Sequence, residues 1–289
     1  MQNKTELPKV VKITKIVDEN PVVKTFYFDI SIESRPGQFV MLWLPGVDEK
    51  PISIALDDGK QLALTLCSRG KTTQQIAKMK VGDRLGIRGP YGTVFNFQEG
   101  EHLALVGGGY GAAPLYFVAH EALKKNCTIE FIEGARSEEH LVYVDRLKEL
   151  KNTTLHIATD DGSVGFKGYN TELLKKVIEE NKIDRIMTCG PELMMQKVGE
   201  IGDSNNINTQ ISVERYMKCG FGVCGQCVLD PLGIRSCVSG PVMNSKVLKM
   251  LDEFGKYHRD DLGRKQHFLN PKKDACEPGC GNSAQSECS

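Results

Sequence analysis

Four of the ten cysteines lie between residues 219 and 237, and their spacing is the feature that most restricts how this chain can fold. Four residues separate Cys219 from Cys224, two separate Cys224 from Cys227, and nine separate Cys227 from Cys237. The first three have the plant-type spacing of a loop that wraps a [2Fe–2S] cluster, and thiolates suit iron as soft, charged donors. Glycines, which let the backbone turn its amides toward sulfur, stand at positions 220, 222 and 225. We therefore predict that these four cysteines hold a [2Fe–2S] cluster.

The interval before Cys237 is much shorter than in plant ferredoxins. It predicts a small hairpin that delivers the fourth ligand, with Asp230-Pro231-Leu232-Gly233 as its turn. A structural zinc site is the alternative, because four cysteines also bind zinc tetrahedrally. A zinc ribbon usually pairs two Cys-x2-Cys knuckles, and here only Cys224 and Cys227 form one, so the spacing favours iron–sulfur.

Composition narrows the class of protein. The chain has 289 residues, enough for two domains and a small module, and 40% of them are hydrophobic. Lys plus Arg and Asp plus Glu are each 37, so charge gives no reason to expect nucleic acid or an anionic membrane as a partner. The polar N-terminus does not resemble a signal peptide, and the longest uncharged apolar run, Leu103–Ala119, contains three successive glycines and a proline. Together with cysteines clustered as in metal sites, these features predict a cytoplasmic protein.

The first 98 residues have the pattern of a β-domain. Short β-branched or alternating segments recur about every ten residues between Gly, Pro and Asp, which predicts a six-stranded antiparallel barrel. The expected strands are Val10–Val17, Val22–Ile30, Gln38–Leu44, Pro51–Leu56, Gln61–Cys67 and Arg84–Arg88. One helix is expected at Thr72–Met79.

Residues 99–213 alternate between strand and helix, which predicts a doubly wound, mostly parallel sheet. The expected strands are Leu103–Gly107, Thr128–Gly134, Leu155–Thr159, Arg185–Cys189 and Thr209–Val213. The expected helices run from the glycine loop to about Asn126 and over Glu139–Leu150, Tyr169–Asn181 and Pro191–Ile201. Residues 214–243 form the cysteine module, and 244–289 form an extension with a candidate helix at Lys246–Phe254 and a polar, partly disordered tail.

Two loops of the predicted sheet suit a nucleotide. The segment containing Gly107, Gly108, Gly109 and Gly111 follows a strand and opens a helix, where free backbone amides can receive phosphate or nicotinamide. Cys189-Gly190-Pro191 ends another strand and would border the same crevice, since ligands lie beyond the carboxyl ends of such strands. Arg136 ends a third strand and could hold a ribose or phosphate. Each has a plain structural alternative, namely glycine packing, a small buried cysteine and a solvated arginine.

Taken together, these segments resemble the ferredoxin-NADP reductase superfamily over about residues 8–243. Its flavin motif of the type Arg-x-Tyr/Ile-Ser is similar to Lys50-Pro51-Ile52-Ser53, and its Gly-Pro-x-Gly segment to Gly89–Gly92. The glycine loop and the Cys-Gly-Pro loop look like those of its pyridine-nucleotide domain. Within it, Glu214–Gly220, Cys237–Val242 and Thr159–Gly168 resemble the electron-transfer subunits of type B dihydroorotate dehydrogenases.

The resemblance implies FAD, one [2Fe–2S] cluster and NAD, and an oxidoreductase subunit of pyrimidine biosynthesis. Its partner would be an FMN-containing dihydroorotate dehydrogenase catalytic subunit, in a heterotetramer with two of each. Electrons would pass from FMN through the cluster and FAD to NAD+, with no catalytic residue in this chain. By position, the implied FAD contacts are Lys50, Pro51, Ile52, Ser53, Cys67, Ser68, Arg69, Thr72 and Thr73.

The chain departs from the family pattern at three places. Lys50 replaces the usual arginine, giving a point charge instead of a bidentate fork. The family's Gly-Thr segment is only partly matched by Gly70-Lys71-Thr72-Thr73. The tail adds Cys276, Cys280 and Cys288, which are either incidental or reactive thiols or a second metal site.

Two further points follow from the sequence. Another flavin/iron–sulfur oxidoreductase subunit, like a sulfhydrogenase gamma subunit or a ferredoxin:NADP oxidoreductase subunit, is the alternative function, and NADP in place of NAD stays open. We expect Tyr216, Met217 and Phe221 to face the partner, unless they pack against their own module.

Overall fold

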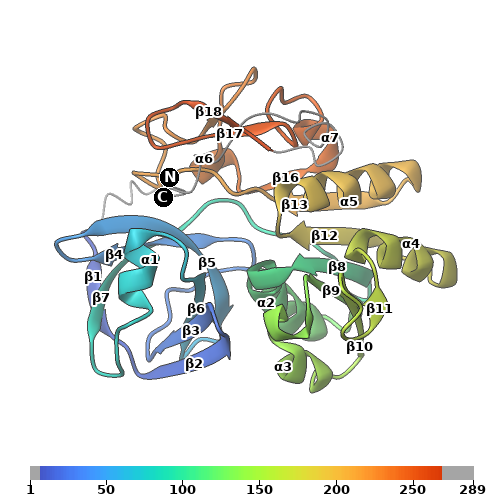
Figure 1. Ribbon diagram of the computed structural model, residues 1–289, viewed down its shortest axis with the longest axis horizontal. Coiled ribbons are helices and arrows are strands. Elements are labelled where there is room, and N and C mark those ends of the chain that lie inside the picture. Colours follow the sequence, from blue (N-terminus) through green and yellow to red (C-terminus); the bar gives the residue numbers. More distant parts are fainter. Residues whose placement is uncertain (1–6, 269–289) are drawn as a thin grey trace, which may run out of the picture.

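The N-terminal part of the chain is a curled antiparallel sheet, seen at the lower left of Figure 1. The computed structural model describes residues 7–268. The strand order is β1-β7-β4-β5-β6-β3-β2. The strands are β1 (Lys9–Lys12), β2 (Lys15–Asn20), β3 (Val23–Phe28), β4 (Phe39–Leu44), β5 (Asp48–Asp57), β6 (Leu62–Cys67) and β7 (Arg84–Tyr91). Side chains alternate along β3, so that Phe26 and Phe28 fill the interior while Val23 and Tyr27 face the second domain.

The sheet has seven strands where six were predicted, because the predicted strand Val10–Val17 divides in two. The amide of Ile13 donates to Asp83 O beside β7 (2.9 Å), and the next amide, of Thr14, donates to Tyr27 O of β3 (2.9 Å). Successive residues therefore bond to opposite ends of the sheet, and no single straight strand can do both. The helix that follows β6, α1 (Lys71–Ile76), is also shorter than predicted.

The second sheet has the order β11-β10-β9-β8-β12-β13-β16 and is parallel except for its last strand. Its strands are β8 (His102–Gly108), β9 (Thr128–Ala135), β10 (Thr153–Thr159), β11 (Phe166–Lys167), β12 (Arg185–Cys189), β13 (Asn208–Ser212) and β16 (Val242–Asn244). Its helices are η1 (Gly109–Gly111), α2 (Ala112–Leu123), η2 (Glu138–His140), α3 (Val144–Lys148), α4 (Asn170–Glu180) and α5 (Glu192–Ser204).

Helices cover both faces of this sheet, which confirms the doubly wound prediction. Leu103 and Leu105 of β8 pack with α2, whereas Ala104 and Val106 of the same strand pack with α4 and α5. Helix α2 also packs on β5, so it lies between the two sheets (Figure 1). Strand order reverses beside β8, and the β8–β12 boundary is therefore the switch point where ligands bind in such folds.

The prediction of one continuous helix over Glu139–Leu150 is wrong, because the structure has two short helices there, η2 and α3, separated by a break. Tyr143 has φ of 67°, and its hydroxyl hydrogen bonds with Thr25 (3.1 Å) and Thr65 of the first sheet. A contact across the domain interface thus overrides the helical pattern.

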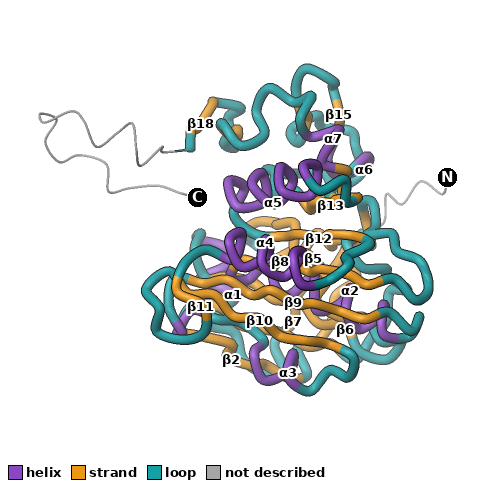
Figure 2. Tube along the Cα trace, turned by 90° about the vertical axis from the view of Figure 1, so that its right-hand side faces the viewer, coloured by secondary structure: helices purple, strands orange, loops and turns teal. Residues whose placement is uncertain are grey.

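The C-terminal part lies above α5 and β13 in Figures 1 and 2. It contains β14 (Val228–Leu229), β15 (Ile234–Arg235), α6 (Ser236–Ser239), α7 (Ser245–Leu248), β17 (Tyr257–Arg259) and β18 (Lys265–His267). The predicted helix Lys246–Phe254 stops after α7. The chain then turns so that Glu253 meets Arg215 and the Gly255 amide meets Glu192.

We propose residues 98, 213 and 243 as domain boundaries, although β16 continues one residue beyond the last. Cys276, Cys280 and Cys288 lie outside the described residues. Within residues 7–268, none of the helices has the length and apolar character needed to span a lipid bilayer.

Candidate functional site

The cysteine module is organised by the predicted hairpin. Strands β14 and β15 pair antiparallel around the turn at 230–233, with Cys227 just before β14 and Cys237 just after β15. The Ser236 amide donates to Cys227 O (3.1 Å), which closes the end of the hairpin. The Val223 amide donates to Cys219 Sγ (3.3 Å), so the glycine-rich loop turns backbone donors toward sulfur as expected. Local pairing therefore gathers cysteines that are far apart in sequence.

The four thiols interact as two pairs. Burial raises the pKa of Cys219, but the amides of residues 221, 223 and 224 and the Cys224 thiol outweigh it and lower the pKa to about 7. The Cys237 thiol is the main cause that lowers the pKa of Cys227 to about 6, and the pKa of Cys237 rises correspondingly. Each pair thus favours one thiolate, the form that binds metal.

Two pairs of thiols fit a two-iron cluster better than one tetrahedral ion. The donor set therefore fits a [2Fe–2S] cluster, with Cys219 and Cys224 as one pair and Cys227 and Cys237 as the other.

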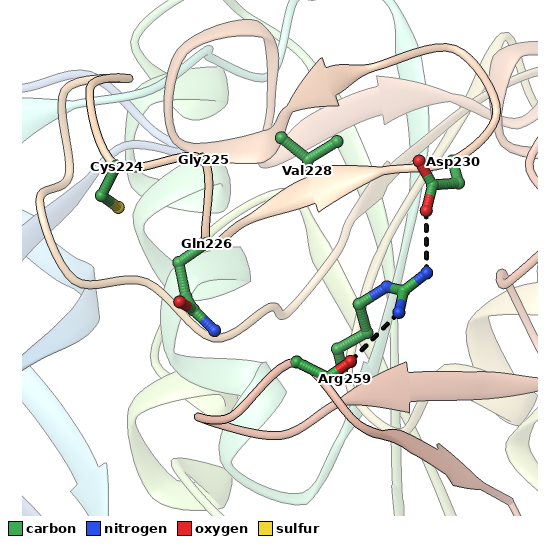
Figure 3. Close-up of a pocket in the computed structure, with 7 residues that line it drawn as sticks. Cys224, Gly225, Gln226, Val228, Asp230 and Arg259 are labelled. Carbon is green, nitrogen blue, oxygen red and sulfur yellow. Dashed lines mark hydrogen bonds and ion pairs between the residues drawn. The ribbon is translucent and has the colours of Figure 1, made fainter.

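Solvent exposure distinguishes the two pairs. Cys227 and Cys237 are buried, Cys219 is partly buried, and Cys224 is exposed. Cys224 and Gln226 line a pocket of about 240 Å³ between the cysteine loop and the β17–β18 hairpin, and Arg259 reaches Asp230 across it (2.8 Å; Figure 3). The Cys219–Cys224 pair is therefore the outer one.

The inner pair packs against the first sheet. Met217, Cys227 and Cys237 form one buried cluster with Phe39, Met41 and Tyr91 of β4 and β7, and Phe221 packs on it. Met217 and Phe221 thus attach the module to the barrel. A Cβ on Gly220 would lie 2.8 Å from Met41, so glycine is needed for this close approach.

The predicted flavin motif lies on β5 beside this module. Lys50 pairs with Asp48 (2.9 Å), and its ammonium lies 5.1 Å from the ring centroid of Tyr216 in the cysteine module. Burial lowers the pKa of Lys50, but Asp48 and Tyr216 more than offset this and raise it. Lys50 therefore stays charged and can meet a phosphate, while Tyr216 is partly buried beside Lys50 rather than standing on a free outer face.

The other proposed FAD segments follow on the neighbouring strand. Cys67 ends β6, which pairs with β5, and Ser68 and Arg69 follow it. Arg69 lies 5.8 Å from the ring centroid of Tyr110 in the glycine loop. Thr72 is buried, and Thr73 Oγ1 already accepts the Gly70 amide (3.1 Å), so these two threonines shape the loop more than they present free groups.

The two nucleotide loops lie against each other at the switch point. Gly107 and Cys189 are register partners on β8 and β12. A Cβ on Gly111 would lie 2.2 Å from Cys189 O, and one on Gly108 would lie 2.7 Å from Pro191. Close packing therefore requires Gly108 and Gly111, whereas a Cβ on Gly109 would meet no atom within 4 Å, so this part of the loop has room for a phosphate.

Cys189 stays a neutral thiol in this crevice, because burial and then the Glu214 carboxylate raise its pKa to about 12. Gly190 joins the two loops closely, with φ of 152°. Arg136 is exposed beside Asp160, so it is free to meet a ribose or phosphate but is not held there.

Sequence reasoning missed the roles of Tyr110, Glu214 and Arg215 at the junction of the glycine loop and the cysteine module. The Tyr110 hydroxyl donates to Glu214 (2.9 Å), and the Glu214 charge raises the Tyr110 pKa well above its usual value. Arg215 is buried between Glu192 and Glu253. The position of Tyr110 inside the glycine loop was the only signal in the sequence that could have revealed this contact.

Two family models match the chain. The model described as the iron-sulfur cluster binding domain of dihydroorotate dehydrogenase B matches residues 214–249, and the oxidoreductase NAD-binding domain matches residues 105–200. These ranges contain the four cysteines and both nucleotide loops.

Relatives match over nearly the whole chain. A Methanocaldococcus jannaschii protein named probable dihydroorotate dehydrogenase B (NAD(+)), electron transfer subunit, is 46% identical, covering 91% of this chain and all of the relative. A protein of the same name from Methanothermobacter thermautotrophicus is 44% identical, covering 90% of this chain and 97% of the relative.

Solved structures show the same fold. The structure of an NADH-dependent reduced ferredoxin-NADP oxidoreductase has a TM-score of 0.76 and 29% identity, covering 84% of this chain and 90% of its own. A ferredoxin NADP+ reductase from Neisseria gonorrhoeae with bound FAD and NADP has a TM-score of 0.59 and 22% identity. The match covers 68% of this chain and 90% of the reductase chain. The expected architecture is thus confirmed. On the identity to its relatives, the chain belongs to the family of dihydroorotate dehydrogenase B electron transfer subunits.

Proposed function

We propose that this chain is the electron-transfer subunit of an NAD-linked dihydroorotate dehydrogenase of pyrimidine biosynthesis. Electrons would pass from FMN of a catalytic partner subunit through a [2Fe–2S] cluster and FAD to NAD+, because flavin exchanges both single electrons and hydride. The similarity of the whole chain to relatives with this name supports the proposal.

The position of strand β5 supports this order of electron transfer. Strand β5, with Lys50–Ser53, contacts both the cysteine module, through Lys50 and Tyr216, and helix α2 of the nucleotide crevice. A flavin held by this strand would therefore lie between the two other redox groups. This order is the one that converts single electrons into a hydride.

The residues of the chain bind and orient these groups in the proposal. Cys219, Cys224, Cys227 and Cys237 hold the irons, and the backbone amides of the loop stabilise charge on sulfur. Lys50 meets an FAD phosphate, and the glycine loop at the start of α2 receives the dinucleotide. The neutral Cys189 thiol marks the nicotinamide end of the crevice.

We propose that the FMN-containing partner docks over the outer cysteine pair, in a heterotetramer with two copies of each chain. Cys224 is exposed there, and three exposed apolar side chains belong to the surrounding segments: Val223 (77% exposed), Val238 and Leu262. These residues take the place of Tyr216, Met217 and Phe221 in the expected interface.

Co-expression with the catalytic subunit tests the function. Cys227→Ser removes one of the four cluster ligands, so it should abolish NAD+ reduction by dihydroorotate. FAD should stay bound, because other residues hold it. Cys127→Ser, which alters a buried cysteine distant from the module, should keep the activity. Unchanged dihydroorotate-linked NAD+ reduction in Cys227→Ser would refute the assignment.

The similarity to the reduced ferredoxin-NADP oxidoreductase structure favours one other candidate, an electron-transfer subunit with a different partner. Purification from native cells distinguishes the two. A co-purifying FMN protein that oxidises dihydroorotate supports the proposed function, and a different flavoprotein supports the alternative.

A further inference from the structure

Glu133 of β9 is a buried acid that none of the proposed roles uses. Its side chain is 0% exposed, and within residues 7–268 neither carboxyl oxygen makes a hydrogen bond of regular geometry. Burial raises its pKa well above the usual value, and a weaker interaction with the Val142 backbone opposes this only in part. A buried carboxyl with so little compensation costs stability, so its position needs a reason.

The position of Glu133 relates it directly to the nucleotide crevice. Gly107 of β8 is the register partner of both Glu133 on β9 and Cys189 on β12. The three residues form one row across adjacent strands, about 5 Å apart from strand to strand. Paired residues of parallel strands point to the same face, so the Glu133 carboxyl and the Cys189 thiol both lie on the α2 side.

The lack of a side chain at Gly107 makes room for the Glu133 carboxyl. A Cβ at Gly107 would lie only 2.5 Å from Glu133 Oε2, so the carboxyl occupies the volume that a side chain would fill. The influence of Glu133 reaches the thiol, since its charge is among the causes that raise the Cys189 pKa. The carboxyl therefore lies below the part of the crevice proposed for nicotinamide.

Among residues 7–268, no cation contributes to the pKa shift of the Glu133 carboxyl. Its partner on β10 is Ile157, and the first turn of α2 begins with Ala112, Ala113 and Pro114. The other charged group that acts on Cys189 is Glu214, which is also acidic and accepts a hydrogen bond from Tyr110; Arg69 lies over the Tyr110 ring. A positive charge entering the crevice is thus the feature that would most favour ionised Glu133.

NAD+ and NADH differ in this respect, because the nicotinamide ring is cationic in NAD+ and neutral in NADH. We propose that Glu133 is a positioning residue that discriminates the two forms: it is ionised below bound NAD+ and takes up one proton when the ring accepts a hydride. The hydride neutralises the ring, and the proton, drawn from solvent, neutralises the carboxylate. This inference rests on the proposed function.

Calorimetric binding of NAD+ and of NADH to the FAD- and cluster-loaded chain tests it. For wild type, the ratio of the Kd for NADH to the Kd for NAD+ should rise as the pH is raised above about 4.5, approaching tenfold per pH unit where one proton is linked. Heats in two buffers of different ionisation enthalpy should show proton release on NAD+ binding. Glu133→Gln should remove both effects.

Two comparisons separate this role from a structural one. Glu130→Gln alters the other buried glutamate of β9, which contacts His102 and His156, and it should leave the pH response unchanged. Glu133→Gln should unfold no more easily than wild type at about pH 8. A raised carboxyl pKa means that the folded wild-type protein loses stability as pH rises above about 4.5, and glutamine abolishes that loss.

The outcomes are distinct. If neither nucleotide binds, the proposed function and this inference both fail. If both bind and wild type and Glu133→Gln show the same pH response, the inference alone is overturned.

Discussion

Arg215 should stabilise the junction of the nucleotide domain, the cysteine module and the C-terminal turn. Its Nη1 lies 2.5 Å from Glu192 at the start of α5, and its Nε lies 2.8 Å from Glu253. The three side chains are 4%, 7% and 1% exposed, so this is a buried network. Arg215→Gln removes the cation from the buried Glu192 carboxylate and leaves Glu253 only a 4.0 Å contact with Arg259.

The expected loss follows from this burial. Removing one partner of a buried ion pair costs about 3–5 kcal/mol, because the remaining charge stays desolvated. Lys197→Gln breaks an exposed pair with Glu200 on the same helix α5 and should cost about 0–1 kcal/mol.

Hydrogen exchange and urea unfolding measure the effect. In Arg215→Gln, amides of residues 192–196, 213–216 and 249–256 should lose protection first, while Trp43 fluorescence should still report a folded first sheet. A global loss below about 1 kcal/mol at about pH 8, similar to that of Lys197→Gln, would refute the view that this network holds the three parts together.

Two further predictions concern the crevice. Gly111→Ala places a Cβ against Cys189 O, so the two loops must separate. NAD+ affinity should then fall about tenfold or more in a calorimetric titration, with FAD content unchanged. Unaltered affinity would contradict the packing described. Cys189, with its pKa raised to about 12, should resist iodoacetamide at pH values where an ordinary thiol of pKa about 8.5 reacts, as read by mass spectrometry; rapid labelling of Cys189 at about pH 8 would contradict its neutrality.

The sequence predicted the elements whose signal is local. Strand Arg185–Cys189 has the predicted bounds, because a strand covered on both faces is a short apolar run between clear breaks. The cysteine hairpin was also predicted, since its turn residues and ligand spacing lie within one short segment.

Long-range contacts decided what the sequence did not show. The break at Tyr143 depends on Thr25 and Thr65 of another domain, and the end of α7 depends on Glu192 and Arg215. Met217 and Phe221 looked suited to a partner because nothing near them in sequence reveals the apolar face of β4 and β7. Glu133 could not stand out, because only the sheet register places it beside Gly107.

The central claim is that four thiolates hold two irons beside a flavin in one chain. Anaerobic purification of the chain, followed by metal, sulfide and flavin analysis and electron paramagnetic resonance after reduction, tests it most directly. We expect two irons, two acid-labile sulfides and one FAD per chain, with a paramagnetic signal in the reduced state. A colourless protein that contains zinc, without sulfide or flavin, would contradict it.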